Sequence, residues 1–235
     1  MAESSGSRSF GPNLEALSEK RKVIAVELQG HGHTPDVDRP LSYEGMADDI
    51  AALIRYFGIE KADIMGYSLG GGVALQTAIR HPELVRKLVV VSAPFKREGF
   101  YPEVLAAMAQ MGPGAGEQMK QSPLAKMYPN VDWERLFTKL GALLRKDYDW
   151  SKDVAAIRAP TMLVFADADA IRTTHIVEFF SLLGGGQKDA GLDGSGRPVA
   201  QLAILPGLTH YNISSSPALA TAVTPFLDAP IPVSK

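Results

Sequence analysis

The chain is most constrained by residues 63–74, which read DIMGYSLGGGVA. The apolar residues before Gly66 are typical of a buried strand, and the spacing over residues 69–80 is typical of a helix. Ser68 therefore stands on a sharp strand-to-helix turn, with Gly66 and Gly70 on either side of it. In such a turn the serine adopts a strained backbone that exposes its hydroxyl, and side chains two residues away would collide with the turn. We expect Ser68 to be a nucleophile.

The expected helix after Ser68 adds an electrostatic element to this turn. The first N–H groups of a helix have no partner within it, so the Leu69 N–H can donate to a negative oxygen that forms beside Ser68. The alternative is a glycine-rich turn whose serine has no role. The strand before the turn and the helix after it favour the nucleophile.

Composition excludes several classes of protein. With 235 residues, 46% of them hydrophobic, the chain can build one core, so we expect one domain with an inserted segment. A net charge of −2 and no Lys/Arg run longer than three residues argue against a nucleic-acid or membrane-surface role, and zero cysteines exclude disulfides and a cysteine nucleophile. The first residues are too polar for a signal peptide, and no apolar run approaches about 18 residues. We expect a cytoplasmic protein.

Apolar β-branched runs alternate with helical patterns along the chain. We expect strands at residues 22–28, 61–65, 87–92, 160–166 and 199–205. We expect helices at residues 12–19, 43–57, 69–80, 173–183 and 216–227. The alternation predicts an α/β fold, with a mostly parallel sheet covered by helices on both faces.

The strand pattern stops over residues 95–158, which are helical in pattern and rich in methionine and aromatic residues. We expect this segment to be a helical cap over the carboxyl edge of the sheet. It would be inserted between two core segments, residues 1–94 and 159–235. Methionines adapt to ligands of varied shape, but a methionine-rich stripe is as often plain core, so both interpretations stay open.

A serine hydroxyl needs a base to take its proton, and the chain has five histidines. His210 lies in a short loop just beyond the last expected strand, at the carboxyl edge where α/β active sites assemble. The other four lie in turns or at helix ends, where structural roles explain them: His31, His33, His81 and His175. We expect His210 to be the base.

The base needs an acid to fix its tautomer and to stabilise the imidazolium. Residues 166–170 read ADADA directly after an expected strand, so Asp167 and Asp169 are both placed at the same sheet edge. One of them would orient His210, and the other would hold a loop or cap a helix. The residues by themselves leave this choice open.

On these residues the chain resembles the α/β-hydrolase fold serine hydrolases, a group that includes small esterases, lactonases, cofactor-free haloperoxidases and carbon–carbon bond hydrolases. Their catalytic residues follow the chain order Ser, Asp, His. The turn at residues 30–32, which reads GHG, is common in them. The resemblance runs from about residue 10 to the C-terminus. It implies Ser68 as nucleophile, His210 as base and Asp169 in preference to Asp167 as acid.

The resemblance implies hydrolysis of carboxylic esters or lactones with short to medium acyl chains, without a cofactor or metal. The expected partner is a small-molecule ester or lactone, not nucleic acid or membrane. Alternatives with the same residues are perhydrolase or haloperoxidase-like chemistry and carbon–carbon cleavage. A weakly active or non-catalytic relic is the alternative from another class. The serine at the turn argues against haloalkane dehalogenases and epoxide hydrolases, which use aspartate there.

The resemblance departs from the family at the N-terminal side. Family members carry two or three strands and a His-Gly loop before the helix matched by residues 12–19, so the chain resembles an N-terminally truncated member. The family's third strand lies between those matched by residues 22–28 and 61–65. We expect these two strands to pair directly, with a homodimer that protects apolar surface or exchanges a strand. The second oxyanion donor would come from Ser4-Ser5-Gly6 or be absent.

Overall fold

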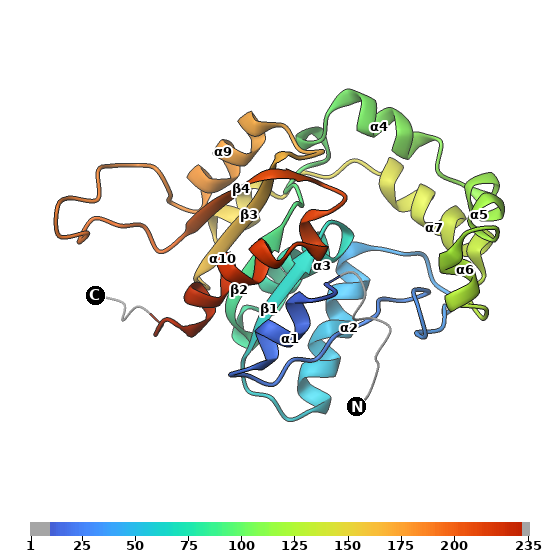
Figure 1. Cartoon of the computed structure of the whole chain (residues 1–235), viewed down its shortest axis with the longest axis horizontal. Coiled ribbons are helices and arrows are strands. Elements are labelled where there is room, and N and C mark those ends of the chain that lie inside the picture. The colour runs from blue at the N-terminus through green and yellow to red at the C-terminus, as the bar shows by residue number, and fades with distance from the viewer. Residues whose placement is uncertain (1–9, 232–235) are drawn as a thin grey trace.

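The computed structural model of the chain describes residues 10–231 and contains one four-stranded sheet. All strands are parallel, and their order in the sheet is β1-β2-β3-β4. The strands are β1 (Ala62–Tyr67), β2 (Val85–Val91), β3 (Thr161–Ala168) and β4 (Gln201–Thr209). Four of the five expected strands are therefore confirmed, and Figure 1 shows them side by side at the centre of the molecule.

Helices cover both faces of the sheet. One face carries α1 (Asn13–Ser18) and α10 (Pro217–Asp228), and the other carries α2 (Tyr43–Tyr56), α3 (Leu69–Arg80) and α9 (Thr173–Leu182). Strand β2 shows why two layers form: Leu88 and Val90 join one core cluster, whereas Val89 and Val91 join the other. Side chains of a strand alternate between faces, so an uninterrupted apolar run requires cover on both sides. The α/β fold class and the five expected helices are confirmed.

Between β2 and β3 the chain is helical. This part contains α4 (Pro102–Ala109), α5 (Pro113–Met119), α6 (Pro123–Met127), α7 (Trp133–Arg145) and α8 (Ser151–Ala155). Short 3-10 turns occupy Pro82–Leu84, Arg97–Gly99 and Ile213–Ser215. Helices α4, α5 and α6 each begin with a proline, whose missing N–H is not needed in the first helical turn. Figure 1 shows α4 to α7 gathered at one side of the molecule, beyond the carboxyl ends of the strands. Across residues 10–231, no helix is both long and apolar enough to cross a bilayer.

Charged contacts tie α7 to the loop that follows residue 28. Lys139 Nζ donates to the two carboxylate oxygens of Asp36 at 2.9 and 2.6 Å, and Arg135 Nε lies 2.6 Å from the same carboxylate. Gln29 Nε2 donates to Asp36 at 2.7 Å. Burial raises the pKa of Asp36, but the hydrogen bonds from Gln29 and Lys139 and the positive charges of Lys139 and Arg135 outweigh it and hold that pKa below its ordinary value. The helical segment is thus joined to the core by a network rather than by one exposed pair.

Residues 22–28 have no regular secondary structure, and within the described part of the chain they pair with no strand. The prediction that they pair directly with β1 is therefore wrong. The two ends of the segment are held by other elements, because Val23 packs against the α1 and α10 layer and Gln29 bonds to the loop at Asp36.

A groove of about 730 Å³ runs along this segment, lined by residues 24–29, by Ile50 and Leu53 of α2, and by Phe57, which follows that helix. It is open to solvent, since Ile24 is 38% and Val26 is 41% exposed. Water can therefore satisfy backbone groups that no strand pairs. The expectation of direct pairing treated those groups as buried, whereas a protein hydrogen bond formed in place of one to water contributes only about 0.5 to 1.5 kcal/mol.

Candidate active site

Each strand of the sheet is followed directly by a polar residue at its carboxyl end. These residues are Ser68 after β1, Ser92 after β2, Asp169 after β3 and His210 after β4. Parallel strands all end at one edge of the sheet, which is where α/β proteins assemble their sites. The last residues of β1 and β2 are paired, as are those of β3 and β4. The end of β2 is paired with Val164 within β3, so Asp169 lies beyond the end of β2 and its carboxylate reaches back to Ser92.

Ser68, His210 and Asp169 form a hydrogen-bonded chain. Ser68 Oγ lies 3.0 Å from His210 Nε2, and His210 Nδ1 lies 3.0 Å from Asp169 Oδ1. The carboxylate is 1% exposed and the imidazole 10% exposed. A carboxylate at Nδ1 holds the proton there, which leaves Nε2 free to accept the serine proton. The structure brings together the three residues that the sequence singled out.

The turn at Ser68 has the strained backbone that the sequence predicts, with φ 51° and ψ −118°. A Cβ on Gly66 would lie 1.9 Å from the Gly70 carbonyl oxygen, so this position must be glycine. The same expectation for Gly70 is wrong, because a Cβ there would meet open space. The second crowded position is Gly71, whose Cβ would lie 2.5 Å from that of Ala93. The contact of α3 with the segment that follows β2 therefore requires glycine one residue later than the five-residue motif indicates.

Leu69 is the first residue of α3, so its N–H lies where the helix provides no acceptor for it. This is the placement that an oxyanion donor beside Ser68 needs. The segment Ser4-Ser5-Gly6, considered as a second donor, lies outside the described residues.

Asp167 has a different environment from Asp169. Its carboxylate accepts hydrogen bonds from the backbone N–H groups of Gly207 at 3.0 Å and Leu208 at 3.2 Å. The hydrogen bond from Gly207 is the main cause that lowers the pKa of Asp167 below its ordinary value. Asp167 is exposed and holds the loop that leads to His210, whereas Asp169 contacts the imidazole itself.

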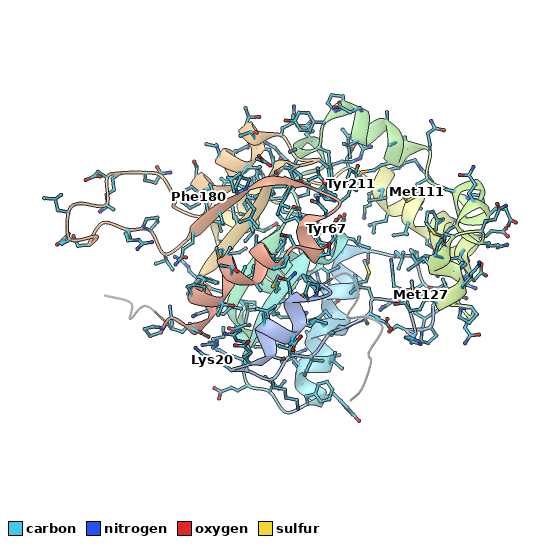
Figure 2. The ribbon with its side chains drawn as sticks, viewed as in Figure 1. Lys20, Tyr67, Met111, Met127, Phe180 and Tyr211 are labelled. Atoms are coloured by element: carbon cyan, nitrogen blue, oxygen red, sulfur yellow. The ribbon has the colours of Figure 1, made fainter. Side chains whose placement is uncertain are left out.

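Two residues that the sequence interpretation left aside complete the site. Ser92 Oγ donates to Asp169 Oδ2 at 2.5 Å, and the Tyr67 hydroxyl donates to the His210 carbonyl at 2.6 Å. Burial, followed by the negative charge of Asp169, raises the pKa of Tyr67 to about 12, so the phenol remains a donor. Figure 2 labels Tyr67 and Tyr211, whose rings each lie 5.4 Å from that of His210 between centroids. The sequence feature that could have identified Ser92 is its position: it directly follows the apolar run of β2, as Ser68 directly follows β1.

The other four histidines have partners elsewhere in the fold. His33 and His81 contact carboxylates, and His31 Nδ1 lies 2.9 Å from a backbone carbonyl. His175 is 2% exposed and stacks on Phe95, with 4.2 Å between ring centroids. Burial lowers the pKa of His175 to about 4. Of the five histidines, His210 is the one at the serine.

Comparison with known proteins places this site in a family. A family model described as alpha/beta hydrolase family matches residues 4–223. A 2-(acetamidomethylene)succinate hydrolase of Mesorhizobium japonicum is 28% identical over 256 residues, which cover 96% of this chain and 85% of that protein. A pimeloyl-[acyl-carrier protein] methyl ester esterase of Neisseria meningitidis is 50% identical over 103 residues, which cover 43% of this chain and 38% of the esterase.

Among solved structures, the enol-lactonase of Burkholderia xenovorans LB400 has the same fold, with a TM-score of 0.71 at 21% identity, covering 96% of this chain and 89% of the lactonase. The chain spans 32% and 38% of the length of two of the first curated relatives that it matches. The match to the family model nevertheless extends over most of the sequence and includes every residue of the hydrogen-bonded chain at the strand ends. The chain belongs to the alpha/beta hydrolase family.

Proposed function

We propose that this chain is a serine hydrolase that cleaves carboxylic esters or lactones through an acyl-enzyme. The observation that carries the proposal is the hydrogen-bonded chain from Ser68 through His210 to Asp169. The names of the relatives, which include an ester hydrolase and an enol-lactonase, support the same class of reaction.

In this proposal Ser68 Oγ attacks the acyl carbon while His210 Nε2 takes the serine proton. Asp169 holds the imidazole in the required tautomer and stabilises its positive charge, and the Leu69 N–H donates to the developing oxyanion. His210 then returns the proton to the leaving alcohol. Water attacks the acyl-enzyme by the same steps in reverse and restores Ser68.

Residues 95–158 form the cap of this enzyme in our proposal, between core segments 1–94 and 159–235. The helices of the segment are short, and the longest, α7, has 13 residues. Such a cap provides no extended apolar lid for long acyl chains. We therefore propose short to medium acyl groups on a small-molecule ester or lactone, and a cytoplasmic location.

Covalent labelling tests the nucleophile directly. Treatment with a fluorophosphonate should add one phosphonyl group, and digestion should place it on Ser68. Ser68→Ala should abolish labelling and lower kcat for p-nitrophenyl butyrate by about 10⁶-fold, because the three residues act as a unit. Labelling at another serine, or none in folded protein, would refute the assignment.

A substrate panel tests the class. Hydrolysis of p-nitrophenyl butyrate should exceed that of the palmitate ester severalfold, and γ-lactones should be opened. Should the second oxyanion donor be absent, kcat falls by about 10² to 10³ relative to a complete site. Peracid formation or carbon–carbon cleavage without ester turnover would instead favour the other chemistries, and a burst of one acyl group without turnover would favour a relic.

A further inference from the structure

We propose that Ser92 is a positioning residue of this site, which holds the carboxylate of Asp169 so that Oδ1 alone faces His210. The inference rests on the proposed function and deepens it, since it adds a fourth residue to the three that are expected to react. Within residues 10–231, Ser92 forms no hydrogen bond with the imidazole or with Ser68, and its hydroxyl contacts the site through Asp169.

The two oxygens of Asp169 have separate partners. Oδ2 accepts from Ser92 Oγ at 2.5 Å and from the Ala166 N–H at 3.0 Å, whereas Oδ1 lies 3.0 Å from His210 Nδ1. An ionised carboxylate accepts hydrogen bonds only, and bonds to an ionised acceptor are short and strong. Two donors on Oδ2 prevent rotation of the carboxylate and leave one oxygen for the imidazole.

The backbone of Ser92 shares a positive φ with that of the nucleophile. Within residues 10–231, Ser68 with φ 51° and Ser92 with φ 47° are the non-glycine residues that have positive φ. Non-glycine residues rarely adopt this conformation, which persists where the surroundings impose it and which clusters at functional sites. Ser92 is 0% exposed, and its N–H donates to the Val164 carbonyl at 2.9 Å, so β3 holds it in place.

Packing provides a competing explanation, in which Ser92 merely fills a tight turn and its hydroxyl takes the nearest acceptor. Against this, a glycine would fit φ 47° without strain, and an alanine would avoid a buried hydroxyl. The Ser92 hydroxyl instead donates to Asp169, whose carboxylate must not rotate if it is to orient His210. The geometry therefore points to the hydroxyl, and not to the backbone, as the reason for serine.

Two substitutions separate the hydroxyl from the backbone. Ser92→Ala removes Oγ and keeps the strained φ, whereas Ser92→Gly removes Oγ and relieves the strain. We expect both to lower kcat for p-nitrophenyl butyrate by about 10- to 100-fold, the scale of a lost hydrogen bond to a charged group, with KM little changed. Ser92→Gly should melt at the higher temperature of the two. Recovery of wild-type kcat in Ser92→Gly would show that the backbone matters and would overturn the proposal.

A double-mutant cycle tests whether Ser92 acts through Asp169. In an Asp169→Ala background, adding Ser92→Ala should change the rate of fluorophosphonate labelling at Ser68 by less than about twofold, since coupled positions are not additive. A further loss as large as in the wild-type background would show an independent, structural effect. Wild-type protein that neither labels nor turns over any ester would refute the proposed function and this role together. Wild-type turnover with an unchanged Ser92→Ala variant would refute this role alone.

Discussion

Neighbouring aspartates two positions apart in the sequence have different partners in the site. Asp169 contacts the imidazole and is 1% exposed, whereas Asp167 is exposed and accepts N–H groups from the loop before His210. Side chains two positions apart on a strand point to the same face, so the alternation of a strand does not separate these two aspartates. Their hydrogen bonds do.

This difference predicts unequal losses on substitution. Asp169→Asn should lower kcat by about 10⁴-fold, because an amide beside Nδ1 favours the wrong histidine tautomer. Asp167→Asn is the matched control and should cost far less, since it changes only the hydrogen bonds to the loop. Steady-state kinetics with p-nitrophenyl butyrate measures both, and the reverse ranking would make Asp167 the acid.

Glycines on the turn at Ser68 also differ at the scale of single residues. Gly66→Ala should destabilise the protein strongly, because the added Cβ would lie 1.9 Å from a backbone oxygen of Gly70. Gly70→Ala places its methyl group in open space and, in the first turn of α3, gains helix propensity of up to about 1 kcal/mol. Thermal melts followed by circular dichroism should give a lowered Tm for the first variant and an unchanged or higher Tm for the second. A similar loss in both would contradict the geometry of the turn.

Helix α9 brings a buried imidazole against the segment that leaves β2. His175 Nε2 accepts the Phe95 N–H at 3.3 Å, and the two rings stack. Burial is the main cause that lowers the pKa of His175 to about 4, so the histidine is neutral in the folded protein at pH 7. The contact therefore holds α9 in place only as long as the imidazole stays unprotonated.

The resulting pH dependence has a defined sign. The pKa of a histidine in the unfolded chain is near 6.5, whereas that of His175 in the folded protein is about 4. Between these two pH values the unfolded chain binds a proton at this position and the folded chain does not. The free energy of unfolding therefore falls as pH falls through this range. The slope reaches about 1.4 kcal/mol per pH unit. Urea unfolding at pH 7 and pH 5 should show a smaller loss in His175→Gln than in the wild type. His33→Gln, at a side chain that is 66% exposed, should keep the wild-type loss. Equal losses in the wild type and in His175→Gln would contradict this account.

At the scale of the whole molecule, apolar side chains remain exposed along the groove beside residues 22–28. Ile24, Val26 and Phe57 are 38%, 41% and 45% exposed. Contiguous apolar surface of this kind often marks a surface that associates. The homodimer expected from the sequence stays a prediction, and this groove is where we place its interface.

Sedimentation equilibrium tests that prediction. The wild-type chain should form a dimer whose population rises with concentration, and Val26→Lys should weaken it by placing a charge in the groove. Val177→Lys changes a valine that is 56% exposed on α9, in a different part of the molecule, and should leave the dimer intact. A monomer at every concentration would contradict the predicted homodimer. Equal weakening by both substitutions would contradict the placement of its interface in the groove.

Local pattern by itself determined most of the fold and two residues of the site, Ser68 and His210. The apolar runs of β1 to β4 and the spacing of α3 depend on neighbours within a few residues, which the sequence displays directly. Ser68 and His210 could be found, and the acid could be limited to Asp167 or Asp169, because each follows an expected strand and parallel strands bring their carboxyl ends to one edge. The choice of Asp169 over Asp167 came from the family resemblance, and only the tertiary contacts explain it.

Tertiary structure decided the features that depend on contacts between distant segments. Residues 22–28 have the apolar β-branched run of a strand, yet pairing requires a neighbour at hydrogen-bond distance. Val23 packs with α1 and α10, Gln29 bonds to Asp36, and the segment is not part of the sheet. Ser92 looks like the last residue of a buried strand until the fold brings the end of β3 beside it. Periodicity reports which face a residue occupies, whereas a hydrogen bond between strand ends 77 residues apart depends on where the whole sheet places them.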